Sequence, residues 1–366
     1  MRSLQSSGPK LDEDWEVILR HLPKRWDEKA FELGAMARAR GFRNPEALLR
    51  TLLIHLSQGC SLMETVVQAR EGGIASISDV ALYKKLRGAA EWLRWMAENL
   101  LKSGSWAGLP DSGLRARAVD ATVVSEPGST GTDWRLHYAI DLKSLSCDFF
   151  ELTDATGGET LLRVPVSPGD LLIGDRGYGG AHGVRHVLDA GGHVLIRLRL
   201  RGFNLTTPRG VNFDLLGRAR KLEAGGIGEW PVDILGAGQP MRGRVCVVRK
   251  SHAAAAEAEK RLRKECSKKG KEPSPAALKA TKFVFLLTTA PPGVLPRRDV
   301  CELYRARWQI ELAFKRLKSI LALGHLPKHD QESCKAWLHG KLLVALLLER
   351  ILESARAFSP WGYQAA

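Results

Sequence analysis

Residues 114–124 read LRARAVDATVV, and at this stretch the hydrophobic pattern of the chain changes from a helical to an alternating period. The alternation continues in DWRLHYAIDL at 133–142 and CDFFELTDA at 147–155, so three successive strands are predicted. The order then continues with a buried strand in DLLIGD at 170–175, a helix in GVRHVLDAG at 183–191 and a strand in GHVLIRLRL at 192–200. This order predicts an α/β domain with a mixed sheet.

The segment before these strands has the pattern of short helices, over residues 11–102. Three of the helices have side chains at their starts that commonly cap helices, namely Asn44, Ser61 and Ser78. Gly, Ser and Pro then cluster at 103–113, which is typical of a linker. We therefore expect an all-helical N-terminal domain over residues 1–108 and a second domain over residues 109–366.

The segment after the fifth strand is too long and too organised for a loop. Residues 201–281 are strand-like as far as about 250 and helical afterwards, so they are interpreted as an inserted β-rich subdomain. A return strand is expected at 282–290, followed by a helix at 297–324. The last apolar pattern predicts a closing helix at 331–358 that packs on the sheet.

The stretch 304–318, YRARWQIELAFKRLK, predicts one helix with two different faces. At about 100° per residue, Tyr304, Arg307, Glu311 and Lys318 fall within an arc of roughly 60° beside an apolar stripe. A carboxylate in this position is suited to bind a hard divalent cation, while the flanking cations are suited to bind phosphate. The alternative is an ordinary amphipathic helix with a solvated polar face.

The overall charge favours a polyanionic partner. The 366 residues include 55 Lys and Arg against 40 Asp and Glu, a formal net charge of +15, and the sequence pI is about 9.7. The six cysteines form no C-x-x-C pair, which is typical of free thiols in a reducing compartment. No apolar run is long enough for a membrane span. We therefore expect a cytoplasmic protein that does not bind membranes.

The spacing Y-x2-R-x3-E-x6-K formed by Tyr304, Arg307, Glu311 and Lys318 resembles the signature of IS4-family bacterial insertion-sequence transposases. The run LLIGDRGYGG at 171–180 and the run RARAVDATVV at 115–124 are similar to the two acidic motifs of that family. The segments TDWRLHYAIDLKS and LTDATGGETLLR, at 132–144 and 152–163, are also similar to it. One mild departure is Ala121, where many relatives have Gly.

The resemblance implies an RNase H-like DDE catalytic domain in which Asp120, Asp175 and Glu311 are both catalytic residues and metal ligands. These acids lie 55 and 136 positions apart, so only the fold can bring them together. Three carboxylates that meet repel one another unless a cation neutralises them, which favours Mg²⁺ or Mn²⁺ at the site. Two such ions would suit an in-line phosphoryl transfer.

Five further residues are candidates for DNA contacts. The resemblance implies that Arg307 and Lys318 contact phosphates near the cleaved end and that Tyr304 contacts the same strand. Arg176 is interpreted either as a DNA contact or as a partner of the acids, and Trp230 either as a stacking residue for a flipped base or as a core residue. The basic run at 261–271 either follows a DNA backbone or belongs to a solvated helix.

These observations predict a nucleoid-associated bacterial transposase that binds the terminal inverted repeats of its own element and its target DNA. It would hydrolyse a phosphodiester, transfer the freed strand and act as a homodimer in the synaptic complex, with no small-molecule substrate. The alternatives are a domesticated RNase H-like nuclease without strand transfer and a catalytically inactive DNA-binding or scaffold protein. A glycosidase is a distant further alternative, since the net charge suits a polyanion better than a neutral sugar. The N-terminal helices are either a DNA-recognition module or a bundle that only packs on the core.

Overall fold

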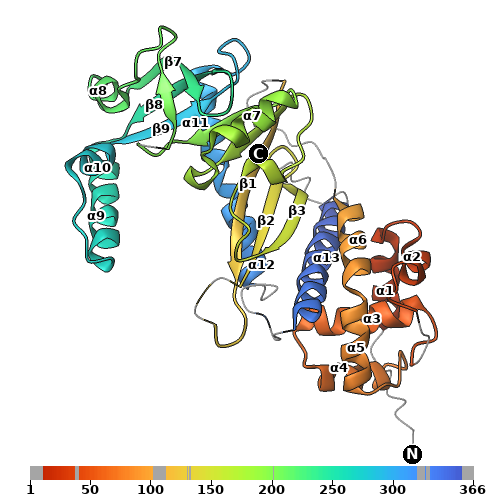
Figure 1. The fold of residues 1–366 in the computed structure, drawn as a ribbon. Coiled ribbons are helices and arrows are strands. Elements are labelled where there is room, and N and C mark those ends of the chain that lie inside the picture. Colours follow the sequence, from red (N-terminus) through yellow and green to blue (C-terminus); the bar gives the residue numbers. More distant parts are fainter. Residues whose placement is uncertain are drawn as a thin grey trace, which may run out of the picture.

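The computed structural model of the protein describes residues 11–37, 41–101, 113–129, 131, 133–200, 202–319, 326 and 330–356. A helical body lies at one end of the molecule, the central sheet lies in the middle, and the insert extends from the other end (Figure 1). No helix in these ranges is both long enough and apolar enough to cross a membrane.

The described residues before 101 form six helices, and the predicted caps begin three of them. These helices are α1 (Leu11–His21), α2 (Trp26–Glu32), α3 (Pro45–Gln58), α4 (Leu62–Glu71), α5 (Asp79–Gly88) and α6 (Ala90–Leu100). The side chains of Asn44, Ser61 and Ser78 accept hydrogen bonds from backbone N–H groups at the starts of α3, α4 and α5. At Ser61 the bond is reciprocated by Glu64, which completes a capping box.

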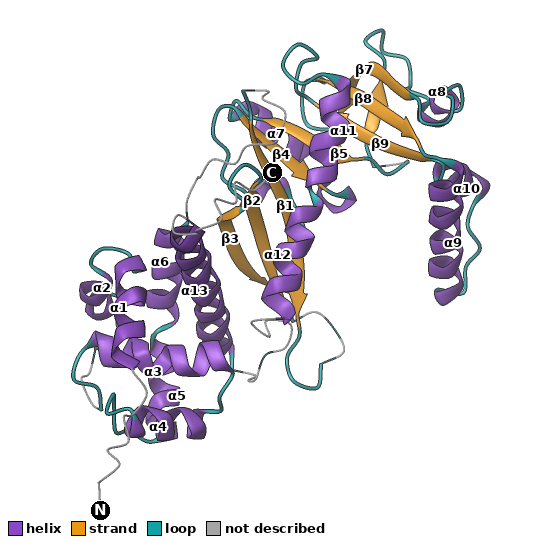
Figure 2. Cartoon of the chain, turned by 180° about the vertical axis from the view of Figure 1, so that it is seen from behind, coloured by secondary structure: helices purple, strands orange, loops and turns teal. Residues whose placement is uncertain are grey.

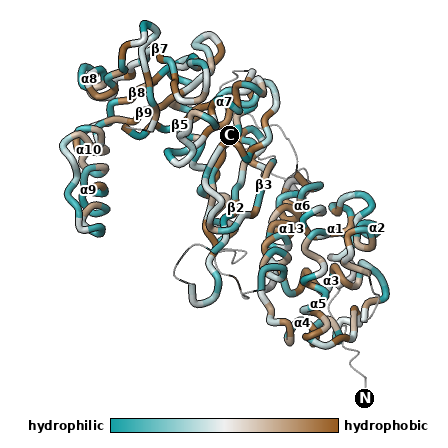
Figure 3. Tube along the Cα trace, in the orientation of Figure 1, coloured by the Kyte–Doolittle hydropathy of each residue, from teal (hydrophilic) through white to brown (hydrophobic). Residues whose placement is uncertain are grey.

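The last helix, α13 (Gln331–Arg356), lies alongside α6 rather than on the sheet, so the prediction of its position was wrong (Figure 2). It also packs against α5, α3 and α1 and only touches β3. His339 contacts the carbonyl of Ala90 through Nδ1 at 3.2 Å, and an added Cβ at Gly340 would collide with Leu56. Hydrophobic segments recur along α6 and α13 (Figure 3). The helix has apolar residues on several sides, and a helical body covers more of them than one sheet face can.

The described strands form one nine-stranded sheet in the order β3-β2-β1-β4-β5-β9-β8-β7-β6. The bounds of the first five strands are β1 Arg115–Val124, β2 Trp134–Asp141, β3 Ser146–Asp154, β4 Asp170–Gly174 and β5 His193–Arg197. β1 pairs with β4 and β4 with β5 in parallel, while β1 to β3 form an antiparallel meander. Helix α7 (Ala181–Asp189) connects β4 to β5. All five strands were predicted, and the mixed α/β, RNase H-like fold class is confirmed.

The insert extends this same sheet instead of forming a sheet of its own. It contains β6 (Asn204–Thr206), α8 (Leu215–Ala219), β7 (Ile227–Leu235), β8 (Met241–Arg249), α9 (His252–Lys268) and α10 (Pro275–Ala280). The return strand β9 (Phe283–Thr288) pairs with β5 on one side and with β8 on the other, both antiparallel. Helices α9 and α10 project from the edge of the sheet as an arm (Figure 1).

A buried ion-pair network fixes β1 against its neighbours. Arg117, only 3% exposed, donates to Oδ2 of Asp148 at 2.7 Å and to Oδ2 of Asp170 at 2.9 Å. Asp170 is the first residue of β4, so this contact helps to set the parallel register in which Ala118 lies beside Ile173. Asp120 and Asp175 each lie two residues beyond this last pair.

The predicted helix over residues 304–318 is two helices joined at Arg307. α11 (Arg297–Ala306) ends there and α12 (Trp308–Ser319) begins on the other side. Ile310, Phe314 and Leu317 are buried on α12, as the apolar stripe predicted, and the ring of Phe314 lies 5.7 Å from that of Tyr138 on β2. Helix α12 therefore crosses the sheet face above β1 and β2 (Figure 2).

Candidate active site

Two carboxylates lie on or directly after the neighbouring parallel strands β1 and β4. Asp120 lies within β1, its side chain is 19% exposed, and its Oδ1 accepts a hydrogen bond from the N–H of Ala121 at 2.8 Å. Asp175 follows β4 and begins a short 3-10 helix (Arg176–Tyr178), where its Oδ1 accepts from the N–H of Gly177 at 2.5 Å. The end of a buried parallel strand is a usual position for a functional side chain.

Arg307 connects the first of these acids to the third. Its Nη1 lies 3.3 Å from Oδ2 of Asp120, and its Nη2 donates to Oε1 of Glu311 at 2.5 Å. The guanidinium side chain is 14% exposed, whereas the side chain of Glu311 is 60% exposed. The two acids from β1 and α12 thus share one buried counter-charge, at the junction of α11 and α12.

The electrostatics of Asp120 are determined first by its burial and then by nearby charges. Burial raises the pKa of its carboxyl to about 6, and the negative charges of Asp175 and Glu159 act in the same direction. The N–H of Ala121 and the guanidinium of Arg307 oppose this shift. A nearby positive charge stabilises the ionised form of such a carboxylate more than it stabilises that of an isolated one.

A divalent cation fits this site by the chemistry of its donors. Carboxylate oxygens are the ligands that hard cations prefer, and a cation would relieve the repulsion that helps to raise the pKa of Asp120. Within the described residues, no three acidic, His or Cys side chains already stand close enough to hold an ion. Arg307 instead bridges Asp120 and Glu311.

Sequence reasoning did not single out Glu159, a fourth acid at this site. A Cβ added at Gly177 would collide with Oε2 of Glu159 and lie 3.0 Å from Oδ1 of Asp175, so the two carboxylates flank the same glycine. Burial raises the pKa of Glu159, and the charge of Asp175 adds to the effect. The only signal was its place in LTDATGGETLLR at 152–163, a segment that resembled the family without indicating which residue mattered.

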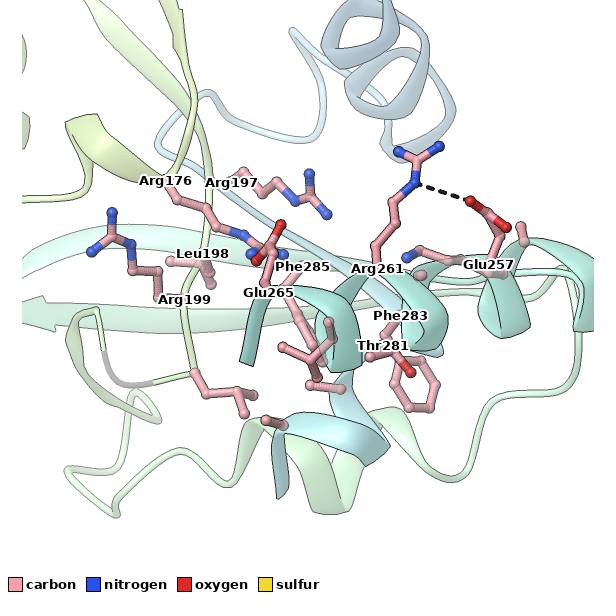
Figure 4. A pocket seen from close by; sticks show the side chains of 17 residues that line it. Arg176, Arg197, Leu198, Arg199, Glu257, Arg261, Glu265, Thr281, Phe283 and Phe285 are labelled. Atoms are coloured by element: carbon pink, nitrogen blue, oxygen red, sulfur yellow. Dashed lines mark hydrogen bonds and ion pairs between the residues drawn. The ribbon is translucent and has the colours of Figure 1, made fainter. Parts of the chain in front are cut away.

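The remaining predicted residues lie at different distances from the acids. The ring of Tyr304 on α11 lies 5.8 Å from the guanidinium carbon of Arg307. Arg176 directly follows Asp175 and points into a cavity (Figure 4). Lys318 is exposed on α12, seven positions beyond Glu311. Trp230 on β7 packs on Phe213 within the insert, with ring centroids 6.5 Å apart, so its predicted contact with a DNA base stays a prediction.

Comparison with known proteins identifies the family. A family profile described as the transposase DDE domain matches residues 111–347. The chain is 36% identical to the InsL protein of insertion sequence element IS186A from Escherichia coli K12, over 95% of this chain and 96% of the relative. It is also 36% identical to the transposase of IS421 from Escherichia coli, with the same coverage of both chains.

A more distant relative is the transposase of IS231B from Bacillus thuringiensis subsp. berliner, which is 26% identical over 91% of this chain and 78% of the relative. The DDE domain implies dependence on a divalent metal in general. Asp120, Asp175 and Glu311 lie inside the matched region, and Arg307 joins the first of them to the third. The chain therefore belongs to the insertion-sequence DDE transposases and is an enzyme that acts on DNA.

Proposed function

We propose that the protein binds the terminal inverted repeats of its own insertion sequence, hydrolyses a phosphodiester at each end and joins the freed 3′-OH to target DNA. The observation that carries this proposal is the bridge through Arg307, which joins Asp120 to Glu311, and the position of Asp175 directly after β4, the strand beside β1, supports it. A homodimer would hold both ends of the element, because two inverted repeats are related by two-fold symmetry.

In this proposal the three acids hold Mg²⁺ or Mn²⁺, in two sites. When bound, such ions activate the attacking oxygen and stabilise the leaving one. Asp120 and Asp175 are held by backbone hydrogen bonds on rigid elements, so their oxygens are oriented before the substrate arrives. Glu311, which is more exposed, completes the set from α12.

The cations beside the acids position the DNA. Arg307 and Tyr304 stand together at the start of α12, where a scissile phosphate would lie, and Arg176 and Lys318 extend the positive charge to either side. We also propose that the helices of residues 1–108 recognise the element ends, while residues 109–366, with the insert at about 201–281, form the catalytic domain. Because α13 packs into the helical body, the two parts share that helix.

The experiment is a cleavage assay on a labelled duplex that carries the element's end, with Mg²⁺, with Mn²⁺ and with EDTA. Asp120→Asn, Asp175→Asn and Glu311→Gln should each abolish cleavage and retain DNA binding in a gel-shift assay, since binding comes from basic residues elsewhere. Glu302→Gln, an exposed acid on α11, is the matched control and should cut normally. An acid variant with wild-type cleavage would remove that residue from the site, and cleavage without joined products would point to a nuclease.

A further inference from the structure

A cavity of about 690 Å³ lies beside the candidate active site, between β5, β9 and helix α9 (Figure 4). Five cationic side chains line it: Arg176, Arg197, Arg199, Lys250 and Arg261. Among the residues that the structure describes, two acids line it with them, Glu257 and Glu265. We call this the cationic cavity.

The charge in the cationic cavity is largely uncompensated. Of the five cations, only Arg261 has an ion-pair partner in the described part of the chain, Glu257 on the same helix at 3.3 Å. Burial lowers the pKa of Lys250, and the neighbouring charges of Arg197, Arg176 and Arg261 lower it further. Cations that repel one another in a partly buried space are stabilised by an anion with several charges.

The cationic cavity is connected to the acids. Arg176 is the residue after Asp175, and it reaches the cavity from the end of β4. Arg197 and Lys250 also line a second hollow of about 500 Å³, whose other wall includes Tyr304 and Arg307. A chain of phosphates passing the acids therefore meets further cations in the direction of the insert.

We propose that the cationic cavity binds the phosphate backbone of one DNA strand where that strand continues from the scissile phosphate towards the insert. This inference rests on the proposed function and adds to it a binding site formed by β5, β9, α9 and Lys250, the residue that follows β8. A single strand is the occupant because a cavity of this volume accepts a ligand of drug size, which corresponds to a short piece of one strand and not to a duplex.

This proposal combines the two interpretations of the basic run at 261–271, namely contact with a DNA backbone and a solvated helix. Arg261 faces the cationic cavity, whereas Arg263 pairs with Glu259 at 2.8 Å and does not line it. Helix α9 has no buried residue among those described, so its folding does not require the cavity-facing charge. One face of α9 is thus the wall of the proposed site and the other is ordinary solvated surface.

The test uses the full-length protein and an element-end duplex that carries single-stranded extensions of increasing length beyond the scissile phosphate, on either strand. Binding is measured by fluorescence anisotropy in EDTA at several KCl concentrations. For the wild type, extending one of the two strands should raise affinity and steepen the salt dependence. The double variant Arg199→Gln/Lys250→Gln should lose this gain, and its salt slope should fall by about two, one for each lost phosphate contact.

Arg263→Gln on the same helix is the matched control and should keep the gain. Methylphosphonates in the extension, which remove the charge from the DNA side, should abolish the gain in the wild type and so test the site even if the double variant does not fold. An equal gain in the wild type and a folded double variant, or no gain from either extension, would overturn the proposal.

Loss of the proposed function itself would be seen separately. The blunt element end and an unrelated duplex are run in the same series, and the extensions are repeated on the unrelated duplex. No preference for the element end, together with no cleavage in Mg²⁺, would contradict the proposed function, while the extension effect would still report on the cationic cavity.

Discussion

Nη1 of Arg307 lies 3.3 Å from Oδ2 of Asp120, although 187 positions separate the two residues in the sequence. The contact depends on the break between α11 and α12, because Arg307 stands at the junction of these helices. From there the guanidinium also reaches Glu311, one turn into α12. The Arg307 side chain therefore joins an acid of the sheet to an acid of α12.

Replacing Arg307 should change how the site binds a cation. In Arg307→Gln the positive charge beside Asp120 and Glu311 is lost, so the DNA-free protein should bind Mn²⁺ more tightly, by about tenfold or more. Cleavage should nevertheless fall, because a phosphate contact is lost as well. Calorimetric titration of Mn²⁺ gives the affinity, and Arg305→Gln, an exposed arginine of α11, is the control. Unchanged Mn²⁺ affinity in Arg307→Gln would show that the guanidinium does not compete with the ion.

The raised pKa of Asp120 predicts that, when no metal is bound, ionisation of this carboxyl lowers the free energy of unfolding. Its folded pKa of about 6 exceeds the ordinary value of 3.8 for an Asp carboxyl, so the folded state binds the proton more tightly and stability falls as the pH rises from about 4 to 6. In EDTA at pH 7.5, Asp120→Asn should be more stable than the wild type, by at most about 3 kcal/mol. At pH 4 the difference should vanish. Urea unfolding measures the difference in stability at each pH. Mg²⁺ should stabilise the wild type but not the variant.

Much of the fold was predictable because its signals are local. The alternating pattern of β1 to β3, the apolar run of β4 and the caps at Asn44, Ser61 and Ser78 depend on neighbouring residues, and each was confirmed. The position of α13 was not predictable, because an apolar pattern shows that a helix is buried without showing which partner covers it. The same reasoning explains why Glu159 was not predicted as part of the site. It lies in a segment with no regular period, and only the fold brings it close to Asp175.

The sequence indicated candidate members of the site but not the contacts between them. Residues 304–318 contain neither Gly nor Pro, so nothing in the sequence signalled a break at Arg307. The bridge from Arg307 to Asp120 follows from that break and from the crossing of α12 over β1, both of which are tertiary features. The cationic cavity likewise combines residues from β5, β9 and α9 with Arg176 and Lys250, which are far apart in the chain.

Arg117 should be essential to stability, because it is the buried partner of two acids. Arg117→Met would leave Asp148 and Asp170 buried and only partly compensated by Arg115, so unfolding free energy should fall by about 3–5 kcal/mol. Arg242→Met is the control, since that side chain is 88% exposed and its carboxylate partner lies 3.9 Å away; it should change stability by less than about 0.5 kcal/mol. Urea denaturation compares the two. Equal stability of both variants would contradict a structural role for the network.

His339 should make the helical body sensitive to acid. Burial lowers its pKa to about 4, so the folded state binds the proton less tightly than the unfolded state, whose pKa is near 6.5. The contribution of His339 to the free energy of unfolding is fully present above pH 6.5 and decreases as the pH falls towards 4. At pH 5 the loss is about 2 kcal/mol. His339→Gln removes the titrating group and should flatten the pH dependence between 6.5 and 5. Helix unfolding followed by circular dichroism at several pH values gives the comparison, and an unchanged slope would assign the acid sensitivity to other groups.

The packing of α13 predicts that the N-terminal helices do not form a stable unit alone. Without α13, the buried faces of α6, α5 and α3 would be exposed to water, including Leu56 and Trp92. A fragment of residues 1–101 should therefore bind the dye ANS and unfold without a cooperative transition. Joining the same fragment to residues 330–356 through a flexible Gly/Ser linker should restore a cooperative transition in thermal unfolding.

A matched control uses the same fusion with Gly340→Leu. A side chain at this position would collide with Leu56, so the added helix should no longer dock although its length and charge are unchanged. If the fragment of residues 1–101 folded cooperatively alone, α13 would be an accessory to the body and not part of its core. If instead the fusion with Gly340→Leu were as stable as the parent fusion, the helix would stabilise the fragment without the close contact between α13 and α3. A cooperative transition only in the parent fusion would establish that the first and last helices of the chain fold as one body.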